Sequence, residues 1–170
     1  MLFTAVLASG LVFAAGPTAT AEPVALSPQD HAYLIASHQG NLAEILSGTR
    51  AAVSPQGVCA EVRQLGPMLV IDHTQLDAMG LAVGLRNGVV PPLTPNPDQT
   101  QRLLSTGMKT GRDFDRAWLQ MQIDFHTATL ALGQQQLAFG SSEEVKMLAR
   151  QAQPRVEHHL ALAREAMTRC

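Results

Sequence analysis

Apolar residues recur every three or four positions along four stretches of the chain, which is the spacing of one face of an α-helix. These stretches cover residues 28–52, 56–86 and 113–140, and a last one begins at Glu143. The third is the most regular, with inward positions at Leu119, Ile123, His126, Leu130, Gly133 and Leu137. The apolar and polar alternation of a half-buried strand is poor throughout. The pattern therefore predicts an all-α fold, a four-helix bundle.

Local signals mark where these helices begin and bend. Residues 27–30 (Ser-Pro-Gln-Asp) are typical of a helix start, because serine caps free amides, proline suits the first turn and an acid favours the helix dipole. Residues 141–144 (Ser-Ser-Glu-Glu) offer a capping box for the last helix. Gly66-Pro67 interrupts the second stretch, since proline lacks an amide hydrogen and clashes with the preceding turn. We expect either a kink there or a regular helix that begins only at Pro67.

A long connection separates the second and third predicted helices. Asn87-Gly88 closes the second helix, and four prolines between residues 91 and 97 exclude regular structure there. Residues 98–108 suit a short helix, after which Gly111 permits a turn. Links between antiparallel neighbours in a bundle are usually much shorter.

Composition fits one folded domain. The chain has 170 residues, of which 46% are hydrophobic and 15% charged, so it can bury a sizeable core. Its formal net charge is −2, and no basic stripe is present, so the sequence gives no indication of nucleic-acid binding.

The N-terminal stretch resembles an export signal. Residues 1–21 carry no charge, residues 2–15 are apolar, and Ala19-Thr20-Ala21 supplies small residues for cleavage before Glu22. The n-region lacks the usual Lys or Arg, and the alternative is a buried apolar segment. We predict a signal peptide over 1–21, a single helical domain over 22–170, no transmembrane segment in the mature chain, and a periplasmic or secreted location.

Three histidines fall on inward-facing stripes of different predicted helices: His73, His126 and His159. A buried imidazole without a partner costs free energy, so three in one core demand an explanation. Neutral imidazoles that converge in a bundle form a nitrogen site for a transition metal such as zinc, copper, nickel or iron. Glu44 on the first helix is the natural fourth ligand, and His38 on the same helix is an alternative one.

A structural polar layer is the competing hypothesis. Each ring would then pair with a backbone carbonyl or with a nearby acid, namely Asp72, Asp77, Asp124 or Glu157. The protein would be a non-catalytic envelope stress or interaction protein. A di-iron oxidase is disfavoured, because no Glu lies three residues before a His. Zinc-protease, Cys-x-x-Cys and phosphate-loop motifs are missing as well, and no catalytic residue is predicted.

Several short segments together resemble a bacterial family of unknown function whose members are commonly labelled outer membrane proteins and described as ferritin-like four-helix bundles. The matching segments are Ala-Glu-Ile at 43–45, Met-Leu-Val-Ile-Asp-His at 68–73, Ser-Thr-Gly at 105–107, Asp-Phe-Asp-Arg at 113–116, residues 121–126, Pro154 and His159-Leu160. The resemblance covers residues 29–167. It departs at Gly66-Pro67, where the family continues a plain helix.

The resemblance implies a fold and a set of polar positions, but no established activity. Glu44, His73, His126 and His159 occupy the characteristic polar positions of the family. A ferritin-like path uses the Pro-rich connection as a crossover, which makes the second and third long helices parallel. That path brings Cys170 towards Cys59, whereas a simple up-down bundle separates them, so their pairing stays open.

Overall fold

The computed structural model describes residues 25–53 and 56–170, which form five α-helices and no strand. The helices are α1 (Pro28–Val53), α2 (Ala60–Arg86), α3 (Pro97–Gly107), α4 (Gly111–Phe139) and α5 (Glu143–Arg169). The prediction of an all-α fold is confirmed. The predicted signal peptide, residues 1–21, lies outside the described residues.

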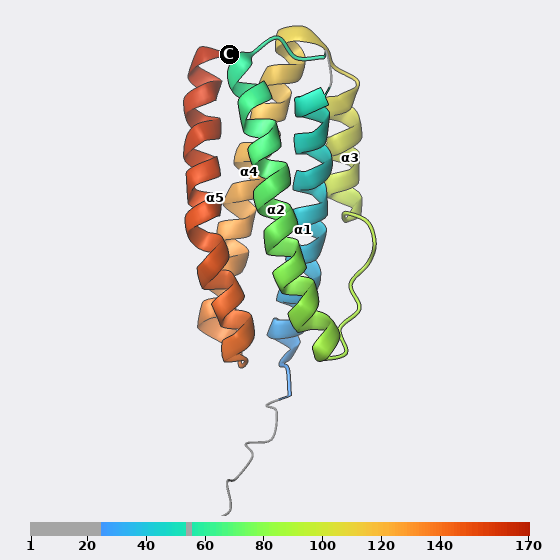
Figure 1. The fold of residues 1–170 in the computed structure, drawn as a ribbon, viewed down its shortest axis with the longest axis vertical. Helices are drawn as coiled ribbons and strands as arrows, with labels where there is room; N and C mark the ends of the chain where they lie inside the picture. Colours follow the sequence, from blue (N-terminus) through green and yellow to red (C-terminus); the bar gives the residue numbers. More distant parts are fainter. Residues whose placement is uncertain (1–24, 54–55) are drawn as a thin grey trace, which may run out of the picture.

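The four long helices lie lengthwise beside one another, and the short α3 packs on the outside against α1 and α4 (Figure 1). α2 and α4 run in the same direction, and α1 and α5 run in the opposite one (Figure 1). The segment after α2, followed by α3, carries the chain back along the molecule before α4 begins. This long return is what permits two consecutive long helices to be parallel.

α2 is one helix that continues through Gly66-Pro67, so the prediction that its regular part begins at Pro67 is wrong. Pro67 is exposed, and Gly66 faces α1. A Cβ on Gly66 would lie 2.8 Å from the carbonyl oxygen of Gly48, and a Cβ on Gly48 would lie 2.6 Å from that of Gly66. The two glycines therefore allow α1 and α2 to approach closely and fix how the helices are aligned.

Two apolar clusters fill the two halves of the molecule. One contains Leu69, Trp118 and Ala163, and the other contains Tyr33, Val83 and Val145. On α2, α4 and α5 alike, the residues between these clusters include a histidine. The histidines thus form a polar layer between two apolar halves.

A disulfide joins the start of α2 to the end of α5. Cys59 and Cys170 are bonded with a Cα–Cα distance of 5.8 Å, which resolves the pairing that the sequence left open. The buried Asp115 of α4 accepts hydrogen bonds from the amides of Val58 and Cys59, both at 2.9 Å. A side chain of α4 therefore caps the N-terminus of α2 and fixes the backbone of Cys59.

Within residues 25–53 and 56–170, no helix combines the length and the apolar character that crossing a membrane requires.

Candidate metal centre

Three imidazole rings, one each from α2, α4 and α5, meet in the layer between the apolar clusters. His73, His126 and His159 are 2%, 1% and 0% exposed. Their ring centroids are 5.3 to 5.5 Å apart, and one ligand atom from each lies within 4.8 Å of the others. The three histidines therefore lie at a common depth, as the helical pattern predicted, and form a cluster that could hold a metal ion.

Each ring places one nitrogen on an oxygen acceptor at 2.9 Å. The pairs are His73 Nδ1 with Asn41 Oδ1, His126 Nδ1 with the Gln122 carbonyl oxygen, and His159 Nε2 with Asp72 Oδ2. An oxygen acceptor requires the ring nitrogen that faces it to carry the proton. In a neutral ring, the other nitrogen then bears a lone pair.

The remaining nitrogens lack proton donors. His126 Nε2 and His159 Nδ1 face each other at 3.3 Å, and His73 Nε2 is buried without a hydrogen-bond partner. With neutral rings, the pair at 3.3 Å consists of two lone pairs that repel each other. The cluster is therefore incomplete as a hydrogen-bonded layer, and a cation at its centre would complete it.

Burial keeps the rings neutral. It lowers the pKa of His73 well below its usual value and the pKa of His126 to about 4, and the neighbouring imidazoles reinforce both shifts. Burial also lowers the pKa of His159, against the opposing effect of Asp72. Neutral imidazole is the protonation state in which histidine binds a metal.

Glu44 of α1 lies beside His126 and is 3% exposed. Its Oε1 is 3.3 Å from His126 Nδ1, the nitrogen that also faces the Gln122 carbonyl. Burial raises the pKa of Glu44 well above its usual value, although a hydrogen bond from Ser47 opposes the shift. Glu44 is outside the group whose ligand atoms lie within 4.8 Å of one another. Its role as an oxygen ligand stays a prediction.

Residues 15–166 match a family model described as "Domain of unknown function (DUF4142)". The chain belongs to the DUF4142 family. This description names neither an activity nor a membrane location. A search of curated proteins found no match.

Among solved structures, this DUF4142 chain is similar to the crystal structure of a DUF305 fragment from Deinococcus radiodurans. The TM-score is 0.71 at 18% sequence identity, over 85% of this chain and 99% of that one. At this identity the likeness shows the arrangement of helices alone.

The other histidines of this DUF4142 member lie outside the cluster. His38, the predicted alternative ligand, is buried and pairs with Asp77 at 2.7 Å. His31 and His158 are exposed. Of the suggested acidic partners, Asp72 and Asp77 do contact histidines, whereas Asp124 and Glu157 bond to other residues.

Sequence reasoning missed Asn41 and Gln122 as partners of the histidines. Gln122 precedes His126 by four residues, the spacing at which a helical side chain can reach a backbone carbonyl. Asn41 lies seven residues before Gly48, and His73 lies seven residues after Gly66. The glycine contact therefore sets the helix alignment that brings Asn41 to His73, and periodicity within one helix cannot show it.

A small cavity, partly open to the surface, lies beside the cluster. It measures about 30 Å³, and His73, Asn41, Thr129 and Ala152 are among its lining residues. This volume suits a water molecule. Of the three clustered histidines, only His73 is among its lining residues.

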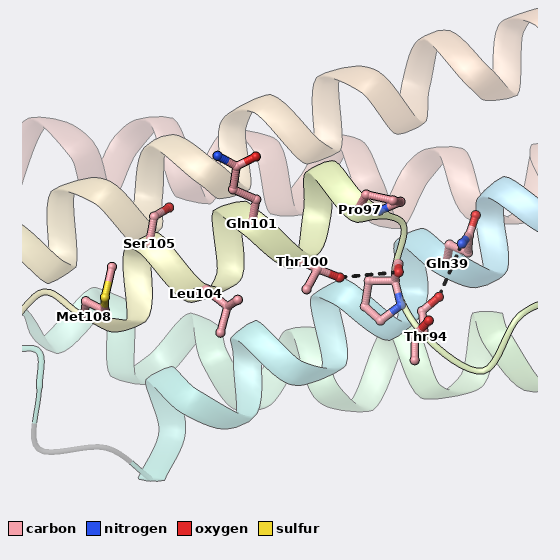
Figure 2. A pocket seen from close by; sticks show the side chains of 9 residues that line it. Gln39, Thr94, Pro97, Thr100, Gln101, Leu104, Ser105 and Met108 are labelled. Carbon is pink, nitrogen blue, oxygen red and sulfur yellow. Dashed lines mark hydrogen bonds between the residues drawn. The ribbon is translucent and has the colours of Figure 1, made fainter.

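A larger groove lies elsewhere, along α3. It measures about 700 Å³, and Figure 2 shows Leu104, Met108 and Gln39 on its walls. Gln39 donates a hydrogen bond to the Thr94 carbonyl at 3.3 Å, which ties α1 to the segment before α3 (Figure 2). No ionisable side chain is among the lining residues, so this groove offers no acid or base.

Proposed function

We propose that the protein binds one transition-metal ion through His73, His126 and His159. The 3.3 Å separation of His126 Nε2 and His159 Nδ1 carries this proposal. Two nitrogen ligands at about 2.0–2.1 Å from a tetrahedral ion are about 3.3 Å apart. The rings are thus already spaced as ligands while no proton donor lies between them.

The surrounding residues support the same proposal. Metal-bound imidazoles usually donate their other N–H to a carboxylate or carbonyl, which fixes the tautomer and strengthens the ligand. The Asp72 carboxylate accepts such a bond from His159, and the Gln122 carbonyl accepts one from His126. Glu44 lies beside His126, and we assign it the part of an acid that loses its proton when the ion binds, so that its carboxylate balances the ion's charge. A water from the cavity beside His73 would then complete the coordination.

The chemistry of the donors sets the class of ion. Imidazole nitrogens suit zinc, copper, nickel and iron, whereas magnesium and calcium prefer oxygen. Arg155, one turn before His159, opposes a bound cation, because its charge already lowers the pKa of His73 and His159. The carboxylate of Asp72, which contacts His159, offsets it.

The rival proposal is a non-catalytic envelope protein in which the histidines only organise the core. The three acceptor contacts at 2.9 Å favour it, since a structural histidine needs at least one such bond. It leaves the inward nitrogens unexplained. It also predicts that the purified protein holds no stoichiometric metal.

We further propose that the protein is exported and that its fold is a ferritin-like four-helix bundle around this site. The parallel direction of α2 and α4 supports the bundle path (Figure 1). The Cys59–Cys170 disulfide supports an oxidising compartment, because such bonds persist outside the cytosol. The uncharged N-terminal stretch, residues 1–21, would serve as the signal peptide for export.

Elemental analysis of the dialysed full chain, loaded in turn with zinc, copper, nickel and iron, tests the metal proposal. We expect about one equivalent of one of these ions per chain, as a tetrahedral three-histidine site requires. A His73→Leu/His126→Leu/His159→Leu variant should lose it. A matched His31→Leu/His158→Leu variant, altered at the two exposed histidines, should keep it. Wild type without stoichiometric metal would favour the structural layer.

A further inference from the structure

One carboxylate oxygen contacts both sulfur atoms of the disulfide. Glu61 Oε2 lies 3.0 Å from Cys59 Sγ and 3.9 Å from Cys170 Sγ. A disulfide carries no S–H, so the carboxylate gains no hydrogen bond from either sulfur in the oxidised protein. These atoms form a second group of ligand atoms within 4.8 Å of one another, at the opposite end of α2 from Arg86. A carboxylate placed against two sulfurs suits the reduced protein, in which the disulfide is open and the sulfurs are thiols or thiolates.

We propose that reduction of the Cys59–Cys170 bond creates a second metal site, in which two thiolates and Glu61 bind one thiophilic divalent cation of the Zn²⁺ or Cd²⁺ type. With metal–sulfur and metal–oxygen distances of about 2.3 and 2.1 Å, a tetrahedral ion separates its sulfur and oxygen ligands by about 3.6 Å. The present contacts of 3.0 and 3.9 Å bracket this value. The sulfurs must separate to about 3.8 Å, which small rotations of the side chains provide.

The backbone around Cys59 does not depend on the disulfide. Asp115 holds the amides of Val58 and Cys59, so this ligand stays in place when the bond opens. Cys59 is also the N-cap of α2, where the helix dipole favours a thiolate. The cationic side chain of Arg169 lies 3.8 Å from the other Glu61 oxygen, Oε1, which leaves Oε2 directed at the sulfurs.

A groove gives access to this end of the molecule. It has a volume of about 190 Å³ between α2 and α5, and Glu61, Met68, Glu165 and Arg169 line it. Cys59 and Cys170 are half-buried rather than enclosed. A small reductant or a hydrated ion can therefore approach, and water in the groove can supply a fourth ligand.

The chemistry balances with a dithiol as reductant. Thiolate attack breaks the Cys59–Cys170 bond, and two electrons pass to the protein as the dithiol becomes a cyclic disulfide. The protein gains two thiols. When the divalent ion binds, both thiols release their protons to water, and the two thiolates with the Glu61 carboxylate surround the ion.

Titration of the full chain with Cd²⁺ tests this site, because cadmium thiolates absorb strongly in the ultraviolet. After reduction with a phosphine and its removal under argon, we expect one more equivalent of Cd²⁺ than in the oxidised protein, together with the charge-transfer band. Glu61→Gln should weaken this binding at least about tenfold, whereas the matched Glu165→Gln variant from the same groove should change it less than about twofold.

Two further variants separate this site from the histidine cluster. The His73→Leu/His126→Leu/His159→Leu variant should keep the reduction-dependent equivalent, and Cys59→Ser/Cys170→Ser should lose it while keeping metal at the histidines. The inference is overturned if reduction adds no Cd²⁺, if the double serine variant binds it equally, or if circular dichroism shows that reduction unfolds the helices.

Discussion

Asp30 and the histidine cluster are both buried polar groups that join helices, but hydrogen bonds satisfy them to different degrees. Asp30 is 0% exposed and accepts bonds from Gln136 Nε2 at 2.6 Å and from the Ser27 and Ser141 hydroxyls at 2.7 Å. The amide of Ser142 adds a further bond at 3.2 Å. The histidine cluster has acceptors on its outer side and no donor inside. The carboxylate of Asp30 is satisfied within the protein, whereas the histidine cluster keeps inward nitrogens that a bound cation could satisfy.

The protonation states follow the same contrast. Burial alone would raise the pKa of Asp30, but hydrogen bonds from Ser141, Gln136 and Ser27 outweigh it and hold the pKa well below its usual range. The fold therefore favours the charged carboxylate. At the histidines, burial acts with little opposition and favours the neutral ring. The buried charge of Asp30, with its matched donors, has a structural role, whereas the converging imidazole lone pairs of the cluster fit the binding of a cation.

The largest expected effect is the loss of the Asp30 carboxylate. Asp30→Ala leaves the buried Gln136 amide and the Ser141 hydroxyl without their acceptor, and we expect it to lower the free energy of unfolding by about 3–5 kcal/mol. Urea denaturation followed by circular dichroism measures this. Asp113→Ala, at an exposed acid, is the control and should cost less than about 1 kcal/mol. Equal losses in the two variants would refute the structural role of Asp30.

Substitution within the histidine cluster should behave differently. His73→Leu removes an unsatisfied nitrogen, so we expect the metal-free protein to change by less than about 1 kcal/mol. The stabilisation by bound metal should disappear, which at an ion concentration of 100 times Kd is about 2.7 kcal/mol. Thermal unfolding with and without the ion measures both values. A metal-free His73→Leu protein that unfolds as readily as Asp30→Ala would show that the layer is structural.

The contrast also explains what the sequence could predict. Helical periodicity located the long helices and placed His73, His126 and His159 on inward stripes, because each signal lies within one helix. Ser27 and Asp30 were expected only to start a helix, yet Asp30 also binds Gln136 and Ser141, more than a hundred residues away. Such contacts depend on how helices align with one another, which a pattern within one helix does not encode.

The alignment of α1 and α2 gives a prediction of intermediate size. Gly66→Ala places a Cβ 2.8 Å from the Gly48 carbonyl, so the helices must separate, and we expect a loss of about 1–3 kcal/mol. The Asn41–His73 hydrogen bond should then lengthen or break, so the affinity of the histidine cluster for metal should fall. Gly80→Ala in the same helix meets nothing within 4 Å and should be neutral or stabilising by about 0.5–1 kcal/mol. Chemical denaturation and metal titration of both variants check this. Unchanged metal affinity in Gly66→Ala would mean that the glycine contact does not position His73.

The smallest expected effect is a pH dependence that isolates the charge of Asp30. Asp30→Asn keeps one acceptor oxygen and loses the charge, so it should destabilise the protein less than Asp30→Ala. The folded-state pKa of Asp30 lies below its usual value of 3.8, so the unfolded chain takes up the proton first as pH falls. The charge therefore contributes stability that is fully present above pH 3.8 and is lost as pH falls towards the folded-state pKa. Denaturation midpoints of wild type and Asp30→Asn should thus converge on acidification below this pH. A constant difference between them would mean that the shape of the side chain, rather than its charge, joins α1 to α4 and α5.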